Sequence, residues 1–305
     1  MKLIDLHCDT LYRLRKTGAH FYDRKGHVNA RALQQGHYLA QCFAVYQPAE
    51  VVGEDGYRHF AEQRRLFEEI VNRYPLSRAK TATDIRQNGG DGHISALLTV
   101  ENADFLQNDL QRLEDVEQAG ITLLGLIHNS ENCLGYPQTD HPTKALFPLK
   151  AFGRQVVERL NSSPMTIDVS HLNVGGFRDV AAISQKPFIA SHSGCRAVWD
   201  HPRNLYDDQI RAIAQSGGVV GMVFYSRFLN GTDTTSKEDI LRHLAHLIRV
   251  GGEDVAALGS DFDGMDCQLF LQDAGDMPTL TEAIIRAFGH PVAEKICYKN
   301  ALRIL

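Results

Sequence analysis

Apolar, β-branched runs alternate along the chain with stretches whose apolar residues recur at helical spacing. Several of these runs are almost continuously apolar, as expected for parallel strands that are covered on both faces. We predict eight strands, at 2–9, 38–46, 94–101, 121–128, 165–171, 187–192, 219–225 and 255–261. Helices are predicted most clearly at 57–73, 152–161, 207–216 and 237–250, and two more C-terminal helices at 280–305, separated near Gly289-His290-Pro291.

Eight strands with helices between them predict a parallel (β/α)8 TIM barrel. The chain contains no linker rich in Pro, Gly or Ser and no low-complexity tract, so we expect residues 1–305 to form a single domain. The segment 129–149 is polar, includes three prolines, and is too long for an ordinary strand-to-helix connection. We expect a long loop there, which is either a lid over a site or a plain surface excursion.

Composition and charge exclude several classes of partner. The chain is 43% hydrophobic, which is ample for a large core, and its net charge of −5 comes with no basic run that would favour nucleic acid. The sequence has no apolar stretch of about 18 residues, so we expect no membrane span. The first residues enter a strand without the pattern of a secretory signal, and the six cysteines form no CxxC pair. We therefore expect a cytoplasmic protein with reduced thiols.

Potential metal ligands and proton carriers stand at the ends of separate apolar runs. His7 and Asp9 are two residues apart, so on an extended strand both point to one face. The carboxyl ends of parallel barrel strands meet on one rim, and the candidates that would gather there are His7, Asp9, Glu101, His128, His171, His192 and Asp261.

This set of residue types favours a metal site. Imidazole and carboxylate suit zinc and also manganese, iron or cobalt. Asp9 and Glu101 supply the negative charge that two cations need, and a carboxylate can bridge two ions. A water between two such ions would lose a proton near neutral pH and become a nucleophile. A lone histidine in an apolar setting is more often a core residue, but repetition at one topological point is hard to obtain from packing, because buried charge is costly. His128 could serve the substrate rather than a metal, and we expect the remaining histidines on the surface.

The chain resembles the membrane (renal) dipeptidase family, the M19 metallopeptidases of the amidohydrolase-like barrels. The resemblance runs from the first strand to the last helix. The matching stretches are Asp5-Leu6-His7-Cys8-Asp9-Thr10, Val100-Glu101-Asn102-Ala103, His128-Asn129, Ile167-Asp168-Val169-Ser170-His171, Ser191-His192-Ser193, Arg203-Asn204 with Asp207-Asp208, and Gly259-Ser260-Asp261-Phe262-Asp263-Gly264.

The resemblance implies a role for each matched residue. His7 and Asp9 would hold one zinc, His171 and His192 the other, and Glu101 would bridge the two. His128 would polarise the scissile carbonyl, Arg203 would pair with the substrate carboxylate, and Asp261 would carry the proton. Tyr225 would contact the substrate. The resemblance also implies tolerance of a D-residue at the C-terminal position, and a homodimer. The stretch 146–153 departs from the family pattern, which puts the shape of the neighbouring loop in doubt but not the ligands.

These points predict a dinuclear zinc dipeptidase that uses a bridging hydroxide on small dipeptides with a free C-terminus. A guanidinium suits that carboxylate because it can donate two parallel hydrogen bonds. Arg203 could instead form a surface salt bridge with Asp207 or Asp208, and Arg196 is a rival carboxylate binder.

Two other functions remain open from the sequence. One is an amidohydrolase-type enzyme acting on another small amide, a lactone or a phosphoester, or a deaminase. Two residues argue against these activities. Many such enzymes have a second histidine where this chain has Asp9, and a modified lysine at the end of the fourth strand where this chain has His128. The other is a non-catalytic barrel, which we would expect to have lost ligands.

Overall fold

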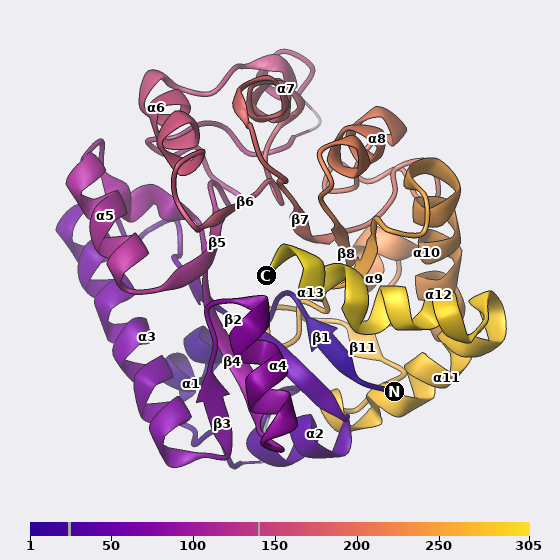
Figure 1. The fold of residues 1–305 in the computed structure, drawn as a ribbon. Helices are drawn as coiled ribbons and strands as arrows, with labels where there is room; N and C mark the ends of the chain where they lie inside the picture. Colours follow the sequence, from indigo (N-terminus) through magenta and orange to yellow (C-terminus); the bar gives the residue numbers. More distant parts are fainter. Residues whose placement is uncertain (24–25, 140) are drawn as a thin grey trace.

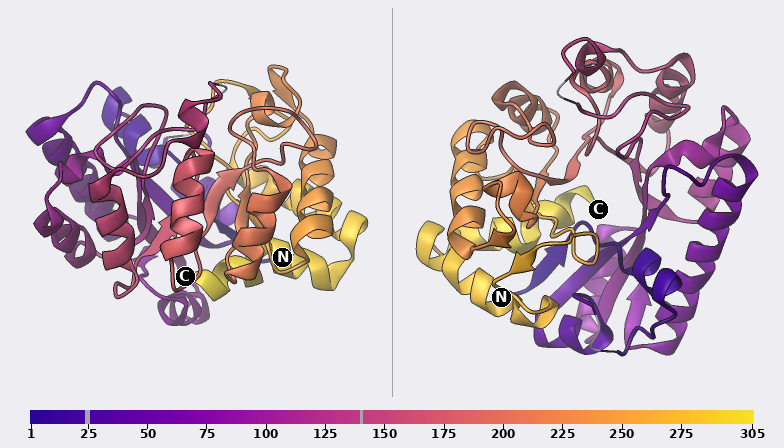
Figure 2. Two further views of the ribbon diagram at one scale, coloured as in Figure 1. Left: turned by 90° about the horizontal axis from the view of Figure 1, so that it is seen from above. Right: turned by 180° about the vertical axis from the view of Figure 1, so that it is seen from behind.

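The computed structural model describes residues 1–305 except 24–25 and 140. Eight parallel strands form its central sheet, in the order β6-β5-β4-β2-β1-β10-β8-β7. Figure 1 shows the strands arranged as a ring with most of the helices around them, and the right view of Figure 2 shows the same arrangement from behind. The strands are β1 (Leu3–Asp5), β2 (Tyr38–Tyr46), β4 (Ile94–Glu101), β5 (Ile121–Gly125), β6 (Thr166–Asp168), β7 (Ala190–Ser193), β8 (Val220–Met222) and β10 (Ala256–Leu258).

The ring closes between β6 and β7, the two ends of that strand order. A single parallel bridge joins Asp168 to Ile189. Ile189 donates its N–H to the carbonyl of Ile167 at 2.9 Å, and Val169 donates to the carbonyl of Ile189 at 2.8 Å. The fold is therefore the predicted (β/α)8 barrel in one domain, and its closing ladder is short.

Helices follow most of the strands, as predicted. The four strongest expectations correspond to α3, α6, α8 and α10, with α3 starting at Gly53 rather than at 57. The sequence patterns did not single out α1, α2, α4, α5 or α7. The helices are α1 (Thr10–Thr17), α2 (Ala30–Gln35), α3 (Gly53–Arg73), α4 (Ala82–Gly90), α5 (Leu110–Gln118), α6 (Ala151–Leu160), α7 (Val174–Ile183), α8 (Asp207–Gln215), α9 (Ser226–Leu229), α10 (Lys237–Gly251), α11 (Met277–Phe288), α12 (His290–Glu294) and α13 (Asn300–Ile304).

The C-terminal helices close one end of the barrel. The expected break falls at Gly289, after which α12, a π-helical turn at Lys295–Lys299 and α13 follow without a gap. Asn300 donates its side-chain amide to the carbonyls of Glu253 and Ala256, each at 2.8 Å. Ala301 and Leu302 pack into the cluster of inward-facing strand residues, and Figure 1 shows α13 across the centre of the ring. The opposite end of the barrel is left for the site.

Most strands end earlier than their apolar runs. The hydrogen-bonded ladder of β1 stops at Asp5, that of β5 at Gly125 and that of β6 at Asp168. The residues that follow, such as Leu126 and Ile127, remain fully buried. The apolar run therefore continues into the core after hydrogen bonding to the neighbouring strand has ended. Consequently His7 and Asp9 do not lie on a strand, and Asp9 is instead the residue before the first turn of α1.

Smaller elements complete the chain. β3 (Leu76–Arg78) pairs with β4, and β9 (Thr234–Thr235) with β11 (Gln268–Leu269). The segment 129–149, apart from residue 140, contains only one short 3-10 helix, at Lys144–Leu146. It contacts the start of α7, where the Asn173 side chain donates to the carbonyls of Lys144 and Phe147, each at 2.8 Å.

The remaining histidines are not all on the surface, contrary to the expectation. His59, His243 and His246 are buried. The Nε2 atom of each ring has a hydrogen-bond partner, for example the Leu229 carbonyl for His243, and this satisfies the buried polar atom. The cysteines are all free thiols. No helix among the described residues is both long and apolar enough to cross a membrane.

Candidate metal and active site

A cavity of about 540 Å³ lies at the carboxyl ends of the barrel strands. A second cavity of about 510 Å³, beside Lys80, Glu117 and Arg159, contains none of the predicted ligands. Six of the predicted site residues line the first one: Asp9, Glu101, His128, His171, Tyr225 and Asp261. The others, His7, His192 and Arg203, are buried directly beside these six.

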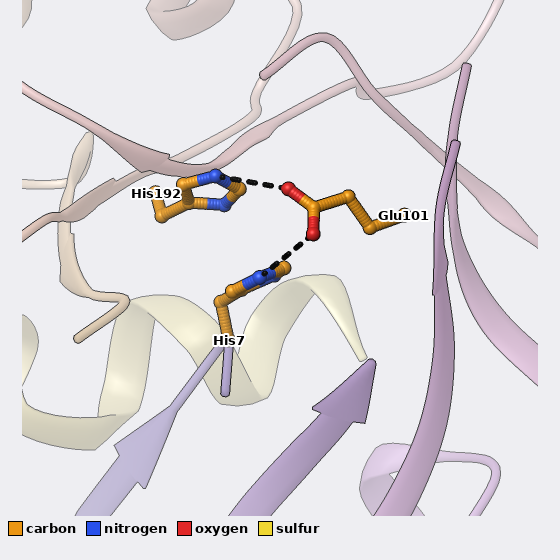
Figure 3. A group of neighbouring side chains, drawn as sticks. All are labelled: His7, Glu101 and His192. Carbon is orange, nitrogen blue, oxygen red and sulfur yellow. Dashed lines mark ion pairs between the residues drawn. The ribbon is translucent and has the colours of Figure 1, made fainter. Parts of the chain in front are cut away.

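Glu101, the last residue of β4, stands at the centre of the cluster. Its Oε2 lies 3.6 Å from His7 Nε2, and its Oε1 lies 3.4 Å from His192 Nε2 (Figure 3). The same Oε1 lies 2.9 Å from His171 Nε2. One carboxylate oxygen therefore faces His7 and the other faces the pair of histidines from β7 and the end of β6.

Hydrogen bonds fix how His171 and His192 present their Nε2 atoms. His171 Nδ1 lies 2.9 Å from the Asn129 Oδ1, which accepts only. His192 Nδ1 lies 2.9 Å from Ser191 Oγ, whose own proton goes to Asp168. Each Nδ1 therefore carries the proton, and each Nε2 offers a lone pair. The two Nε2 atoms lie 2.9 Å apart and face a carboxylate oxygen. A bound cation would stabilise this arrangement, whereas hydrogen bonds within the protein would not.

The other side of Glu101 carries atoms without partners. His7 Nε2 and Asp9 Oδ1 are buried and have no hydrogen bond. His7 Nε2 lies 3.6 Å from Asp9 Oδ2 and 3.9 Å from Asp261 Oδ1. Buried polar atoms are normally satisfied, so their convergence here fits a divalent cation.

Groups of three ligand atoms that could hold one ion recur across the cluster. They are His7 with Glu101 and His192, Glu101 with His128 and His171, and His7 with Asp9 and Asp261. Glu101 and His7 each belong to two of the three groups, so these two residues connect the cluster.

Two buried aspartates hold the segments that carry predicted site residues. The Asp5 carboxylate accepts from the N–H and the hydroxyl of Ser260, at 2.8 and 2.6 Å. The Asp168 carboxylate accepts from the N–H of Ser191 at 2.9 Å and from its hydroxyl. Each serine immediately precedes a predicted site residue, Asp261 or His192, so these Asp–Ser pairs position the site. All four residues belong to the matched sequence stretches, but their local pattern gave no sign of this role.

The backbone adopts unusual angles at two of the site residues. His171 has φ +68° and Asp261 has φ +65°, in the left-handed region that non-glycine residues rarely occupy. Such conformations persist where the surrounding structure enforces them, and they cluster at functional sites.

Burial sets the protonation tendencies of the cluster. It lowers the pKa values of His171 and His192 well below the ordinary range, with Arg203 adding to the effect, so both rings are neutral at neutral pH. Burial, together with the charges of Asp9 and Glu101, raises the pKa of Asp261 well above its usual range. The pKa of Glu101 is held low even though burial opposes this, because the imidazoles of His7 and His128 favour its charged form.

Arg203 is buried beside His192, and among the described residues it does not form the surface salt bridge considered from the sequence. Its guanidinium donates to the His192 carbonyl at 3.1 Å and to Ser193 Oγ at 3.4 Å, and its Nε has no partner. Burial lowers its pKa to about 10. Arg196, the rival, pairs with Asp200 at 2.6 Å instead. A buried guanidinium with an unsatisfied donor favours Arg203 as the anion-binding group.

The cavity wall also contains the aromatic residues Tyr12, Tyr46 and Phe228, which were missed from the sequence. Tyr46 contacts both His128 and Tyr12, with ring centroids 4.9 Å apart in each pair. Tyr225 donates its hydroxyl to Asp266 at 2.6 Å and contacts Phe228. Tyr46 is the last residue of a predicted strand, and this position at the rim of the barrel is the sequence signal that could have identified it as a cavity residue.

Comparisons with known proteins agree with this geometry. The family model "Membrane dipeptidase (Peptidase family M19)" matches residues 1–305. The uncharacterized protein in the pqqA 5' region of Klebsiella pneumoniae is 34% identical over 239 residues, 74% of this chain and 86% of that protein. The crystal structure of dipeptidase AC, a metallopeptidase of family M19, has a TM-score of 0.92 at 30% identity and covers 100% of this chain and 97% of its own.

A second structure is equally similar in fold. It is a metallopeptidase from Rhodobacter sphaeroides liganded with a phosphinate mimic of the dipeptide L-Ala-D-Ala. Its TM-score is 0.92 at 28% identity, over 100% of this chain and 98% of that chain.

Proposed function

Because the chain belongs to the membrane dipeptidase family, peptidase family M19, it is a metal-dependent dipeptidase, and we propose that it works with two divalent cations, zinc first among them. Its substrates would be small dipeptides with a free C-terminal carboxylate. The observation that carries this proposal is the position of Glu101, with one carboxylate oxygen toward His7 and the other toward His171 and His192.

The residues present fit such a pair of ions. His7 and Asp9 would hold one, His171 and His192 the other, and Glu101 would be shared. The unpartnered His7 Nε2 and Asp9 Oδ1 support the first position, and the two facing Nε2 lone pairs support the second. Bound there, the cations would supply Lewis acidity and a water of lowered pKa.

The surrounding side chains would bind and orient the dipeptide. Arg203 would pair with its terminal carboxylate, and this is supported by burial without a carboxylate partner at hydrogen-bond distance. His128 lies on the cavity wall next to His171, with ring centroids 4.5 Å apart, where it could donate to the scissile carbonyl. Tyr225 lies on the same wall and would contact the substrate.

Asp261 would move the proton. Its carboxylate lies 3.9 Å from His7 Nε2 and on the cavity wall. A buried carboxyl with a raised pKa can accept a proton from the attacking water and return it to the leaving amine.

The stereochemical range is a separate part of the proposal. The Rhodobacter sphaeroides structure contains a mimic of L-Ala-D-Ala, so we propose that this chain also accepts a D-residue at the C-terminal position.

The test is hydrolysis by metal-reconstituted protein of L-Ala-L-Ala and L-Ala-D-Ala, with and without a chelator. We expect cleavage of both dipeptides, loss with chelator, and recovery on adding zinc. A lactone, a phosphotriester and a cytosine-like base serve as negative substrates. Cleavage that survives complete removal of metal, or activity confined to the negative substrates, would overturn the proposal.

A further inference from the structure

The proposed carboxylate site lies opposite one particular strand of the barrel. Arg203 follows β7 and contacts it through the carbonyl of His192. In the closed ring, three strands separate β7 from β2 in either direction. A dipeptide whose carboxylate meets Arg203 and whose amide lies over Glu101 therefore extends its N-terminal residue toward the end of β2.

The wall at that end is built from a row of rings. His128 contacts Tyr46, the last residue of β2, and Tyr46 contacts Tyr12 of α1, with centroids 4.9 Å apart in each pair. Lys16, one turn further along α1, holds its Nζ 5.7 Å from the centre of the Tyr12 ring. All four residues line the cavity, so the row ends in a cation at the cavity mouth.

Lys16 differs from the other cations near the mouth because it has no ion pair among the described residues. Arg13 pairs with Asp263 at 3.1 Å, Arg15 with Glu62, and Arg227 with Asp266 at 3.5 Å. Two carboxylates near the mouth of the cavity already have partners: Asp263 pairs with Arg13, and Asp266 with Tyr225 and Arg227. Asp9 and Glu101 would be neutralised by the cations they are proposed to hold.

We propose that Lys16 makes this enzyme prefer dipeptides whose N-terminal residue carries an acidic side chain. The ammonium would pair with that side-chain carboxylate, while Tyr12 and Tyr46 pack against its methylene groups. This inference rests on the proposed function, since it takes Arg203 as the group that fixes the other end of the substrate.

The test compares kcat/KM for L-Glu-L-Ala, L-Gln-L-Ala and L-Ala-L-Ala. The Glu and Gln substrates differ in charge but hardly in shape. We expect L-Glu-L-Ala to exceed L-Gln-L-Ala in kcat/KM by about 2- to 5-fold at low salt, the size of one exposed ion pair, and we expect this ratio to shrink as salt is raised.

Two variants assign that preference to one side chain. Lys16→Met should bring the ratio to about one while leaving L-Ala-L-Ala turnover and metal content unchanged, and Lys16→Glu should invert it. Lys2→Met is the matched control, because Lys2 is also exposed and unpaired among the described residues but precedes β1 at the other end of the barrel. It makes the same change in net charge and should keep the ratio.

The outcomes separate this inference from the function on which it rests. Wild-type hydrolysis of L-Ala-L-Ala with a Glu-to-Gln ratio near one, or a ratio that persists in Lys16→Met, would overturn the role of Lys16 alone. An equal rise in KM for all three dipeptides in Lys16→Met would also overturn it, because Lys16 would then bind the main-chain carboxylate. Absence of dipeptide hydrolysis by the metal-loaded wild type would overturn the proposed function itself.

Discussion

Asp168 and Ser191 connect the two strands at which the barrel closes, and the same contact orients a proposed metal ligand. The Asp168 carboxylate accepts from the N–H and the hydroxyl of Ser191, and Ser191 Oγ lies 2.9 Å from His192 Nδ1. Since β6 and β7 share only one isolated bridge, this pair supports both the closure and the site. Asp5 and Ser260 repeat the arrangement between β1 and β10.

Replacing Ser191 with Ala should weaken the site more than the fold. The hydrogen-bonded support of a ligating histidine is worth about 10- to 100-fold in metal affinity, and the lost hydrogen bond should cost about 1–3 kcal/mol of unfolding free energy. Metal content after dialysis against graded chelator, with the thermal midpoint, measures both effects. Ser184→Ala removes a hydroxyl that donates to the Lys186 carbonyl instead and serves as the control. Equal chelator sensitivity in the two variants would refute a positioning role.

Replacing Glu101 with Gln should release at least one cation. The amide keeps the shape but loses the charge that two ions would share, so metal analysis should give fewer than two ions per chain. Glu69→Gln changes an exposed glutamate of α3 and should retain the wild-type content. Two tightly held ions in Glu101→Gln would contradict the bridging role.

Replacing Asp261 with Asn should separate chemistry from metal binding. We expect kcat to fall by about 10²-fold or more because the proton carrier is lost, while metal content stays near that of the wild type. Steady-state kinetics and metal analysis on the same preparation check this, with the exposed Asp233→Asn as control. Full turnover in Asp261→Asn would exclude it as the proton carrier.

Replacing Arg203 with Met should reduce kcat/KM for dipeptides by about 10- to 100-fold, the usual worth of a hydrogen-bonded charge. Dipeptide amides lack the terminal carboxylate, so the variant and the wild type should differ much less on them. Arg196→Met tests the rival arginine, which pairs with Asp200, and should leave both substrates unaffected. The reverse pattern would transfer the carboxylate site to Arg196.

His243 should make the fold sensitive to acid. Its Nδ1 accepts the Cys195 N–H at 3.0 Å and its Nε2 lies 3.0 Å from the Leu229 carbonyl, so the buried ring is neutral. Burial lowers its pKa from the ordinary 6.5 to about 4. As pH falls below 6.5, His243 becomes protonated in the unfolded chain but stays neutral in the folded chain. The free energy of unfolding therefore decreases until the pH reaches about 4.

The expected loss from this one group is up to about 3 kcal/mol of unfolding free energy across that interval. Urea unfolding of the wild type and His243→Gln at several pH values measures it. The variant should be less stable at pH 7, and the difference should narrow as pH falls from 6.5 to 4. A constant difference over this range would show that His243 is not the sensitive group, and the exposed His290→Gln should behave as the wild type.

The hydrophobic pattern predicts the buried segments of the chain more reliably than it predicts where each strand ends. The runs at 38–46 and 94–101 became β2 and β4 without change, because both their faces are buried. The apolar runs that end at His128 and His171 extend beyond the last residues of β5 and β6. A residue is buried whenever other atoms cover it, but it belongs to a strand only if its backbone is hydrogen-bonded to a neighbouring strand.

The amino-acid sequence by itself determined the barrel, its helices in part, the family, and which histidines and carboxylates stand at strand ends, because periodicity and residue type are local properties. The tertiary structure decided what those residues face. It placed Glu101 between His7 and the pair His171 and His192, buried Arg203 against the His192 carbonyl, and joined Asp168 to Ser191. These contacts link positions far apart in the chain, so ring closure and side-chain packing fix them, and no local pattern encodes them.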